Sequence, residues 1–290
     1  MNIGFIGLGE AAGAIISGWK GAHHVRAYDR KLDDSATAGE ILERGNSLGV
    51  TVCATGAETV EVADLVFSTV TADQAVAVAE AHGAALKAGA IWCDLNSCAP
   101  KSKEVAAHVL RATGGRYLDV AVMAPVYPKC NMVPCLISGP EAKDWAPVLA
   151  SLPMDVRVVG DTIGRASSIK MVRSIMVKGM EALTAECVLA AAAADVADEV
   201  FPSLKTGHPK IDVEARANYN FERTLVHGVR RAAEMDEVAK MLRDLGLPDG
   251  MSAAAADWQR ILSGTDLTLP GGDTPDHRWF ATEYLRRFLS

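Results

Sequence analysis

The first half of the chain alternates short apolar runs with amphipathic stretches. The runs are apolar on both sides, which is typical of strands buried on both faces of a parallel sheet. They cover residues 3–6, 25–28, 50–53, 65–69, 91–94, 117–122, 135–138 and 156–159. Helical patterns lie between them at residues 11–20, 36–44, 73–82, 100–112 and 141–152. This alternation predicts a doubly wound α/β domain.

The pattern changes after Gly164. From Arg165 to about residue 200 there is no strand signal and no proline, and apolar residues recur at three- and four-residue steps. This spacing predicts one long helix, which Phe201-Pro202 would end. Residues from about 212 to 263 again read as helices, with a break at 246–249, and the tail at 271–290 ends in a short amphipathic segment. We therefore expect an α/β domain over residues 1–162 and an all-α domain over residues 163–290, joined by the long helix.

The amino-acid composition and net charge argue against several classes of protein. Of 290 residues, 49% are hydrophobic but only 6% are aromatic, so the cores should be mostly aliphatic. The net charge of −7 makes the chain a poor general binder of nucleic acid or of anionic membranes. No apolar run is long enough for a transmembrane helix, and the N-terminus lacks the basic leader of a signal peptide. A cytoplasmic location is the default expectation.

Cysteines and histidines give no metal-binding pattern. The six cysteines include no CxxC pair, and the seven histidines include no HExxH or HxxxH pair. Structural zinc sites usually space their ligands more tightly than the two cysteine pairs with four intervening residues. We expect reduced, mostly buried thiols and no metal.

A glycine-rich turn joins the first strand to the first helix. Its residues are Gly7-Leu8-Gly9-Glu10-Ala11-Ala12, the GxGxxA form of the dinucleotide-binding fingerprint. Gly7 permits the tight turn, Gly9 lets the backbone approach a pyrophosphate, and Ala12 allows close helix–strand packing. The helix N-terminus adds N–H groups and a positive dipole end. The turn predicts a Rossmann-type domain that binds NAD(P), with Gly7, Leu8, Gly9, Glu10 and Ala11 at the phosphates.

An acidic residue ends the second predicted strand. Asp29 follows Gly9 by 29 − 9 = 20 residues, where a carboxylate can accept hydrogen bonds from the adenosine ribose of NAD. Arg30 and Lys31 come next and could hold the 2′-phosphate of NADP instead. The position of Asp29 favours NAD slightly over NADP.

Three segments together resemble the β-hydroxyacid dehydrogenase and 6-phosphogluconate dehydrogenase superfamily, in a branch with a 6-phosphogluconate-dehydrogenase-like C-terminal domain. They are Phe5-Ile6-Gly7-Leu8-Gly9, then Asp94-Leu95-Asn96-Ser97-Cys98-Ala99-Pro100 with Asp119-Val120-Ala121-Val122, and Gly164-Arg165-Ala166-Ser167-Ser168-Ile169-Lys170. The resemblance covers nearly the whole chain. It implies an NAD(P)-dependent oxidoreductase that transfers a hydride between the nicotinamide and a β-hydroxyacid-like alcohol or its carbonyl.

The second segment resembles the substrate-binding signature of the superfamily. The resemblance implies that Ser97 contacts substrate or cofactor, with Asn96 beside it; alternatively, Ser97 merely caps the helix that starts at Pro100. The superfamily then has a Ser-Gly-Gly-type loop that grips the substrate carboxylate. Here the loop reads Val122-Met123-Ala124-Pro125-Val126-Tyr127-Pro128, which is bulkier and more apolar. We therefore expect Val122 and Met123 to line the site of a larger or less polar substrate.

In the third segment the resemblance makes Lys170 the catalytic lysine; alternatively it is a solvent-facing charge. The usual Lys-x-x-Asn-Asn is replaced by Lys170 with Arg173 and Ser174, which share one helix face. Arg173 could lower the pKa of Lys170 or clamp a substrate carboxylate, and Ser174 could donate to a substrate oxygen. We expect Lys178 to pair with Glu181 or Glu186.

Two further contacts follow from the resemblance. Thr69, Val70 and Thr71 would lie beneath the nicotinamide ribose, or form an ordinary turn with Thr71 as a cap. The segment around His227 and Arg231 matches a region where relatives place a basic residue near the cofactor, sometimes in the partner subunit's site. A homodimer is expected, because the Ala-rich helix offers more apolar surface than one small domain can cover and relatives interlock their C-terminal domains.

Two other functions stay open. An imine reductase would reduce a C=N bond, but the usual site of those relatives has Asp or Tyr in place of the lysine. A non-catalytic NAD(P)-binding scaffold is the third reading, and members of that kind have lost the lysine. The presence of Lys170 argues against both.

Overall fold

The computed structural model describes residues 1–19, 23–207, 212–271 and 275–288. The chain forms two compact units, Met1–Met171 and Val172–Ser290. The division falls inside helix α7 (Arg165–Ala193), whereas the change in sequence pattern predicts a boundary between residues 162 and 163. Lys170 thus belongs to the N-terminal unit.

The N-terminal unit is built on a sheet whose described strands follow the order β3-β2-β1-β4-β5-β6-β7-β8. Their bounds are β1 (Ile3–Ile6), β2 (Val25–Tyr28), β3 (Thr51–Val52), β4 (Leu65–Ser68), β5 (Ile91–Asp94), β6 (Arg116–Val122), β7 (Cys135–Ser138) and β8 (Val156–Gly160). Each predicted run became a strand, and the doubly wound α/β prediction is confirmed. An all-parallel sheet is wrong for the last two strands, because β7 pairs antiparallel with β6.

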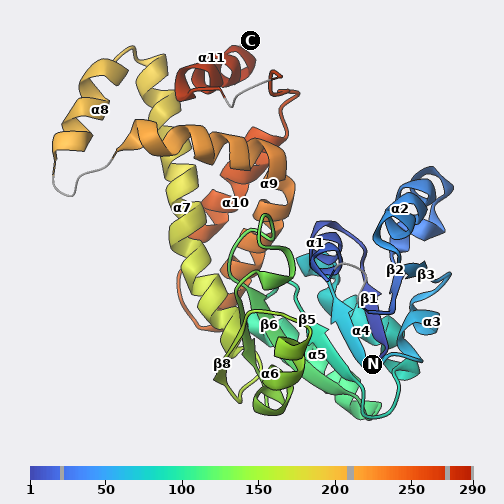
Figure 1. The fold of residues 1–290 in the computed structure, drawn as a ribbon. Helices are drawn as coiled ribbons and strands as arrows, with labels where there is room; N and C mark the ends of the chain where they lie inside the picture. Colours follow the sequence, from blue (N-terminus) through green and yellow to red (C-terminus); the bar gives the residue numbers. More distant parts are fainter. Residues whose placement is uncertain (20–22, 208–211, 272–274, 289–290) are drawn as a thin grey trace. The chain divides into compact units, whose positions relative to one another are not determined.

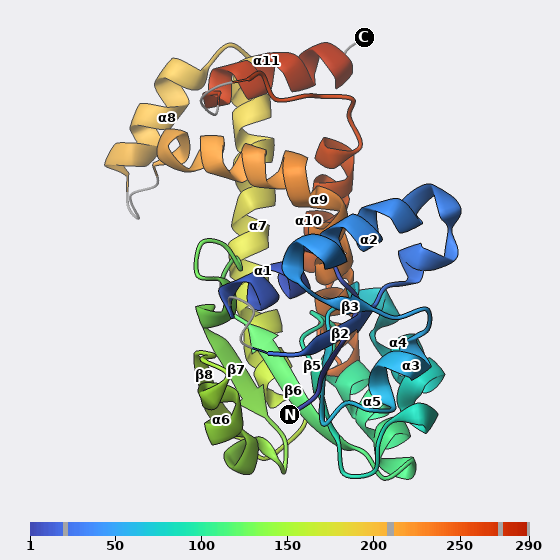
Figure 2. The ribbon, with the colours of Figure 1, turned by 45° about the vertical axis from the view of Figure 1, so that its right-hand side comes forward.

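Helices cover both faces of this sheet (Figures 1 and 2). One layer contains α1 (Glu10–Gly18), α2 (Ser35–Leu48) and α6 (Ala142–Ser151), and the other contains α3 (Gly56–Val60), α4 (Ala75–His82) and α5 (Pro100–Ala112). Successive strand residues point to opposite layers, so Phe5 packs in the first core and Ile6 in the second. Short 3₁₀ turns stand at η1 (Arg30–Asp33), η2 (Ala72–Gln74), η3 (Gly83–Ala85) and η4 (Cys130–Met132). Helix α3 was not predicted, and Lys20, the predicted end of the first helix, lies outside the described residues.

The C-terminal unit is helical, as predicted. Beyond α7 it contains α8 (Ala197–Thr206), α9 (Val213–Asp244), α10 (Gly250–Ser263) and α11 (His277–Phe288). The break predicted at 246–249 lies between α9 and α10, where Gly246 has a φ of 71°. Of the predicted tail, residues 272–274 and 289–290 lie outside the described part of the chain.

The predicted end of the long helix is wrong. Helix α7 ends at Ala193, and Pro202 lies inside the separate helix α8. Asp195 takes a left-handed φ of 53°, its N–H donates to Ala192 O, and Val196 N–H donates to Ala191 O. This is the Schellman ending of a helix, with aspartate where glycine is usual.

Several of the few aromatic residues pack against one another in the C-terminal unit. In the C-terminal unit the ring of Phe221 lies 5.3 Å from that of Phe280 and 5.6 Å from that of Tyr284, and all three side chains are buried. This core is therefore more aromatic than the composition suggested. Among the described helices none combines the length and apolarity that a membrane span requires.

Candidate functional site

The glycine-rich turn lies at the carboxyl edge of the sheet, where strand order reverses between β1 and β4. Gly7 has a φ of +93°, and its N–H donates to Tyr28 O over 2.8 Å. A Cβ at this position would stand 2.6 Å from Thr69 O. Thr69 Oγ1 in turn donates to Gly7 O over 2.8 Å. Gly7 is thus required both by backbone conformation and by the contact with the next loop.

Gly9 caps helix α1, and Glu10 and Ala11 form the first turn of that helix. A Cβ on Gly9 would meet nothing within 4 Å among the described residues. The backbone of the loop is therefore open on this side, as the approach of a pyrophosphate to a helix N-terminus requires. Ala12, at the third position of the fingerprint, is fully buried against the sheet.

The two glycines should respond differently to alanine. Gly7→Ala places a Cβ against Thr69 O at a left-handed φ, so we expect a loss of about 1–3 kcal/mol in the free energy of unfolding. A Cβ at position 9 meets no described atom within 4 Å, so Gly9→Ala should fold normally, but the fingerprint predicts that its methyl would stand where the phosphate approaches. Cofactor affinity should fall roughly tenfold or more. Thermal unfolding and fluorescence titration with NADH measure the two effects; normal NADH binding by Gly9→Ala would contradict the assignment.

Asp29 ends up where the fingerprint predicts, just after β2. Its Oδ2 accepts the N–H of Leu8 over 2.8 Å, and its Oδ1 accepts the N–H of Lys31 over 3.0 Å. The carboxylate is thereby fixed beside the phosphate loop. Arg30 is exposed and donates to Gln74 Oε1 over 3.1 Å, while Lys31 pairs with Glu40.

The segment after β4 touches the phosphate loop as well. Thr69 is half-buried against Gly7, and Val70 packs on the core between the sheet and α4. Thr71 is the N-cap residue of η2, although its side chain makes no capping hydrogen bond to the backbone. The structure thus brings Thr69 and Val70 to the carboxyl edge beside Gly7.

Asn96 provides a free acceptor at the same edge. Its Nδ2 donates to Ser68 Oγ over 2.9 Å, and its backbone N–H donates to Asp94 Oδ1 over 2.9 Å. The side chain is only 3% exposed, and Asn96 Oδ1 accepts no hydrogen bond from the described residues. An orphaned buried oxygen is costly unless a ligand supplies the donor. Together with the open Gly9, it fits a bound dinucleotide.

Ser97 and Lys170 are far apart in the sequence, but their side chains are in contact. Lys170 Nζ donates to Ser97 Oγ over 2.5 Å, and both side chains are half-buried. The N-cap of α5 is Ala99, so the alternative role of Ser97 as that cap is wrong. The positive charge of Lys170 also reaches Cys135, where it opposes the burial that raises the pKa of the thiol to about 12. Lys170 is therefore not a solvent-facing charge.

The loop after β6 is anchored to helix α1. Val122 pairs with Cys135 at the strand end, and Met123 N–H donates to Pro134 O over 2.9 Å. Asn131 is buried against Gly18, whereas Tyr127 is 53% exposed. Val122 and Met123 are half-buried. Pro125 and Pro128 have no N–H, so the loop presents apolar groups and few backbone donors.

Other predicted residues belong to the C-terminal unit. Arg173 is exposed, and Ser174 is buried and accepts from Lys178 Nζ over 3.4 Å. Their action on the substrate stays a prediction. The expected pairing of Lys178 with Glu181 or Glu186 is wrong, because Lys178 Nζ donates to Glu234 Oε2 over 2.6 Å. Helix α9 brings Glu234 to the lysine, which a search along α7 alone could not reveal.

Arg231 is a buried residue of the C-terminal unit. Its guanidinium pairs with Glu181, which also accepts from Gln259. Within this chain it therefore serves the packing of α7, α9 and α10. The role of His227 stays open.

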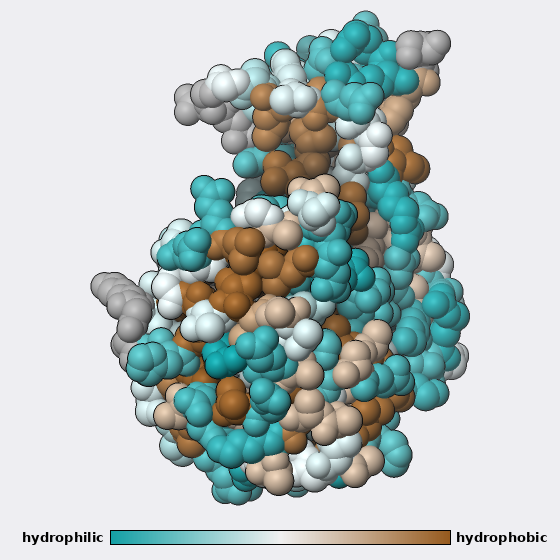
Figure 3. Space-filling view, turned by 90° about the vertical axis from the view of Figure 1, so that its right-hand side faces the viewer, coloured by the Kyte–Doolittle hydropathy of each residue, from teal (hydrophilic) through white to brown (hydrophobic). Residues whose placement is uncertain are grey.

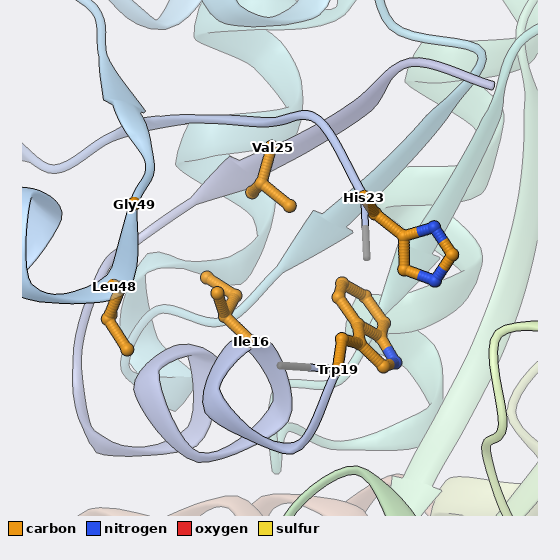
Figure 4. Close-up of a pocket in the computed structure, with 6 residues that line it drawn as sticks. All are labelled: Ile16, Trp19, His23, Val25, Leu48 and Gly49. Atoms are coloured by element: carbon orange, nitrogen blue, oxygen red, sulfur yellow. The ribbon is translucent and has the colours of Figure 1, made fainter. Parts of the chain in front are cut away.

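Two small hollows lie away from this site. One is lined by side chains from α1, the end of α2 and the start of β2, and in Figure 4 the ring of His23 stands beside that of Trp19. The other adjoins the beginnings of β1, β2 and β3. Both are at the amino edge of the sheet, opposite the phosphate loop. Among the described residues, no three His, Cys, Asp or Glu side chains are grouped as metal ligands.

Sequence reasoning missed three charged residues beneath the site. Asp94, Lys103 and Asp119 are fully buried, and Lys103 Nζ lies 2.9 Å from Asp94 Oδ1 and 3.7 Å from Asp119 Oδ1. An available signal was the presence of an aspartate in each of two neighbouring apolar strands, since buried carboxylates need a cation.

Comparison with known proteins agrees with this geometry. Residues 2–149 match the family model described as the NAD binding domain of 6-phosphogluconate dehydrogenase. Residues 191–262 match a domain of unknown function, DUF1932.

Solved structures extend the similarity over the whole chain. A conserved hypothetical protein from Sinorhizobium meliloti is 35% identical, with a TM-score of 0.76 over 99% of this chain and 96% of the other. A conserved protein of unknown function, described as structurally similar to 3-hydroxyacid dehydrogenases, is 26% identical, with a TM-score of 0.67 over 90% of this chain and 98% of the other. The 3-hydroxyisobutyrate dehydrogenase of Mycobacterium tuberculosis is 16% identical, with a TM-score of 0.73 over 97% and 98%, a likeness of fold alone.

Proposed function

Because the chain belongs to the family of the 6-phosphogluconate dehydrogenase NAD-binding domain, we propose that it is an NAD(P)-dependent oxidoreductase acting on an alcohol β to a carboxylate or a similar group. The observation that carries the proposal is the contact of Lys170 Nζ with Ser97 Oγ. It lies at the carboxyl edge of the sheet, on the same edge as the open phosphate loop.

Residues at the carboxyl edge of the sheet are proposed to bind the cofactor. Gly7, Gly9 and the start of α1 would hold the pyrophosphate of NAD(P), and Asp29 would accept hydrogen bonds from the adenosine ribose. Asn96 Oδ1, which accepts no hydrogen bond from the described residues, would accept a donor from the bound substrate or cofactor. When bound, the cofactor supplies the hydride acceptor or donor.

Lys170 handles the proton. As the neutral amine, its Nζ would take the proton of the substrate hydroxyl in the oxidative direction, and as the ammonium it would return that proton in the reductive direction. Ser97 holds both the lysine and the substrate oxygen. Arg173 and Ser174, one helical turn further along α7, orient the substrate in place of the usual amides.

NAD is the favoured cofactor. The carboxylate of Asp29 is fixed by two backbone N–H groups, so it cannot easily turn away from a 2′-phosphate. Arg30 is exposed and engaged with Gln74, although it could swing toward a phosphate. We expect tighter binding of NADH than of NADPH in parallel fluorescence titrations, with the ratio reduced in Asp29→Asn.

The substrate is bulkier or less polar than usual for the family. The apolar loop from Val122 to Pro128 offers few backbone donors to a carboxylate and exposes Tyr127. A panel of 3-hydroxy acids of rising size tests this point. Best activity on 3-hydroxyisobutyrate or tartronate semialdehyde would contradict it.

A spectrophotometric screen tests the reaction class. Purified protein is incubated with NADH or NADPH and with carbonyl acids or cyclic imines, and absorbance of the reduced cofactor is followed. Oxidation with carbonyl acids supports the proposal, and oxidation with imines alone supports an imine reductase. Cofactor binding without any turnover supports the scaffold reading.

A homodimer is part of the same proposal. Figure 3 shows hydrophobic residues gathered in patches on one face of the molecule. In the C-terminal unit, Met176 and Leu183 on α7 and Val226 and Val229 on α9 are each more than half exposed. Large exposed apolar patches often mark an interface between proteins, so these side chains support a homodimer. Light scattering should give twice 30.6 kDa, and a monomer would refute the proposal.

A further inference from the structure

A row of polar side chains crosses the sheet beneath the Lys170–Ser97 contact. Ser68, Asp94, Asp119 and Ser138 are register partners on the neighbouring strands β4, β5, β6 and β7. All four are fully buried. Buried carboxylates at adjacent positions repel each other and need compensation.

Lys103 supplies the cation. It projects from α5 and is 0% exposed. Its Nζ donates to Asp94 O over 2.8 Å and to Asp94 Oδ1 over 2.9 Å, and it lies 3.7 Å from Asp119 Oδ1. Burial alone would lower the pKa of this lysine, but the two carboxylates raise it above its ordinary value. The single ammonium group of Lys103 therefore compensates the negative charges of both Asp94 and Asp119.

The first carboxylate fixes the loop that carries Ser97. Asp94 Oδ1 accepts the N–H of Asn96 over 2.9 Å, and Asp94 Oδ2 accepts the hydroxyl of Tyr117 over 2.6 Å. The backbone is therefore tied down directly before Ser97.

The second carboxylate fixes the start of the helix that carries Lys170. Asp119 Oδ2 accepts the N–H of Ser167 over 3.1 Å, and Asp119 Oδ1 accepts its hydroxyl over 2.6 Å. Ser138 Oγ donates to Asp119 Oδ2 over 3.0 Å and accepts the N–H of Ala166 over 2.9 Å. These bonds satisfy the free N–H groups of the first turn of α7, and the helix dipole offsets part of the carboxylate charge.

We propose that Lys103 is a positioning residue, which couples the Ser97 loop to the first turn of α7 and so sets the contact between Ser97 and Lys170. Its catalytic consequence rests on the proposed function, whereas the coupling itself does not. Lys103 touches neither reacting group, and it acts through Asp94 on one side and through Asp119 on the other.

Hydrogen exchange measured by mass spectrometry on the full chain tests the coupling without any substrate. In Lys103→Met, exchange should rise at least about tenfold both in residues 92–99 and in residues 165–171. Helix α2, at residues 35–48, serves as the internal reference, and its exchange should rise less than that of either target segment. Lys143→Met, at an exposed lysine on α6, is the matched control and should match the unmodified protein in all three segments.

Two milder variants keep the test decisive if Lys103→Met does not fold. Tyr117→Phe removes one bond to Asp94 and should loosen only residues 92–99. Ser167→Ala removes one bond to Asp119 and should loosen only residues 165–171. A rise in the two target segments no larger than the rise in α2, or no rise in either target segment, would overturn the coupling.

Kinetics separate this proposal from the proposed function. With a working substrate, Lys103→Met should lower kcat per folded molecule about tenfold or more and alter the pH profile. Unchanged kcat and pH profile in a folded Lys103→Met would show a merely structural lysine. If exchange rises in both target segments of Lys103→Met but the unmodified protein turns over no substrate, the coupling is supported and the proposed function is contradicted.

Discussion

Lys170→Ala is expected to lower turnover by about 10²–10⁴-fold while leaving NADH affinity nearly unchanged. In the proposed mechanism Lys170 Nζ, which donates to Ser97 Oγ, exchanges the substrate proton, whereas the phosphate loop lies on other elements. Loss of kcat without loss of cofactor affinity is the signature of a group that acts in the transition state.

Steady-state kinetics and a fluorescence titration with NADH measure the two quantities on the same preparation. Lys143→Met is the control for loss of a lysine in the same unit, and it should keep full activity. Turnover that survives in Lys170→Ala would remove the lysine from the mechanism.

Lys103→Met is expected to lower the free energy of unfolding by about 3–5 kcal/mol, because it leaves Asp94 and Asp119 buried without their cation. Methionine matches the length of the lysine stem, so the loss would come from charge rather than from a cavity. Urea unfolding compared with Lys143→Met, which should change stability by less than about 0.5 kcal/mol, measures the difference. A folded Lys103→Met of normal stability would contradict the burial of an essential ion pair.

The interaction of Lys103 with Asp94 and Asp119 also makes the free energy of unfolding depend on pH in the alkaline range. The folded pKa of Lys103 is raised above the unfolded value of about 10.4. Its contribution to stability is therefore complete below that value and is lost as the pH rises through the folded pKa. The stability gap between the unmodified protein and Lys103→Met should narrow above about pH 10.4.

Much of the fold could be predicted because its signals are local. Each buried strand is apolar on both faces, and Gly7 to Ala12 identify the turn that follows the first one. The direction of β7 could not be predicted, since a strand covered on both faces has the same composition in either direction. Helix α3 spans only Gly56–Val60, too short to show a period. The end of α7 depends on a left-handed Asp195 within an Ala-rich run, where nothing marks a stop.

Some residues of the candidate site could likewise be predicted from local sequence, and others could not. Gly7, Gly9 and Asp29 follow from local spacing, but Ser97 and Lys170 are 73 residues apart and were paired only through the family resemblance. Lys101 and Lys103 look alike in the sequence of α5, yet one is exposed and the other is fully buried. Lys103 shares the buried face of α5 with Ala106 and Leu110, and the register that places Asp94 beside Asp119 gives this buried lysine its partners.

The most direct test of the central claim is transfer of label from NADH deuterated at C4 of the nicotinamide. The full chain is incubated with this cofactor and a panel of carbonyl acids, and the products are examined by mass spectrometry. We predict deuterium on the carbinol carbon of at least one product, and its loss in Lys170→Ala. No label in any product, with the cofactor shown to bind, would contradict the assignment of this chain as a dehydrogenase.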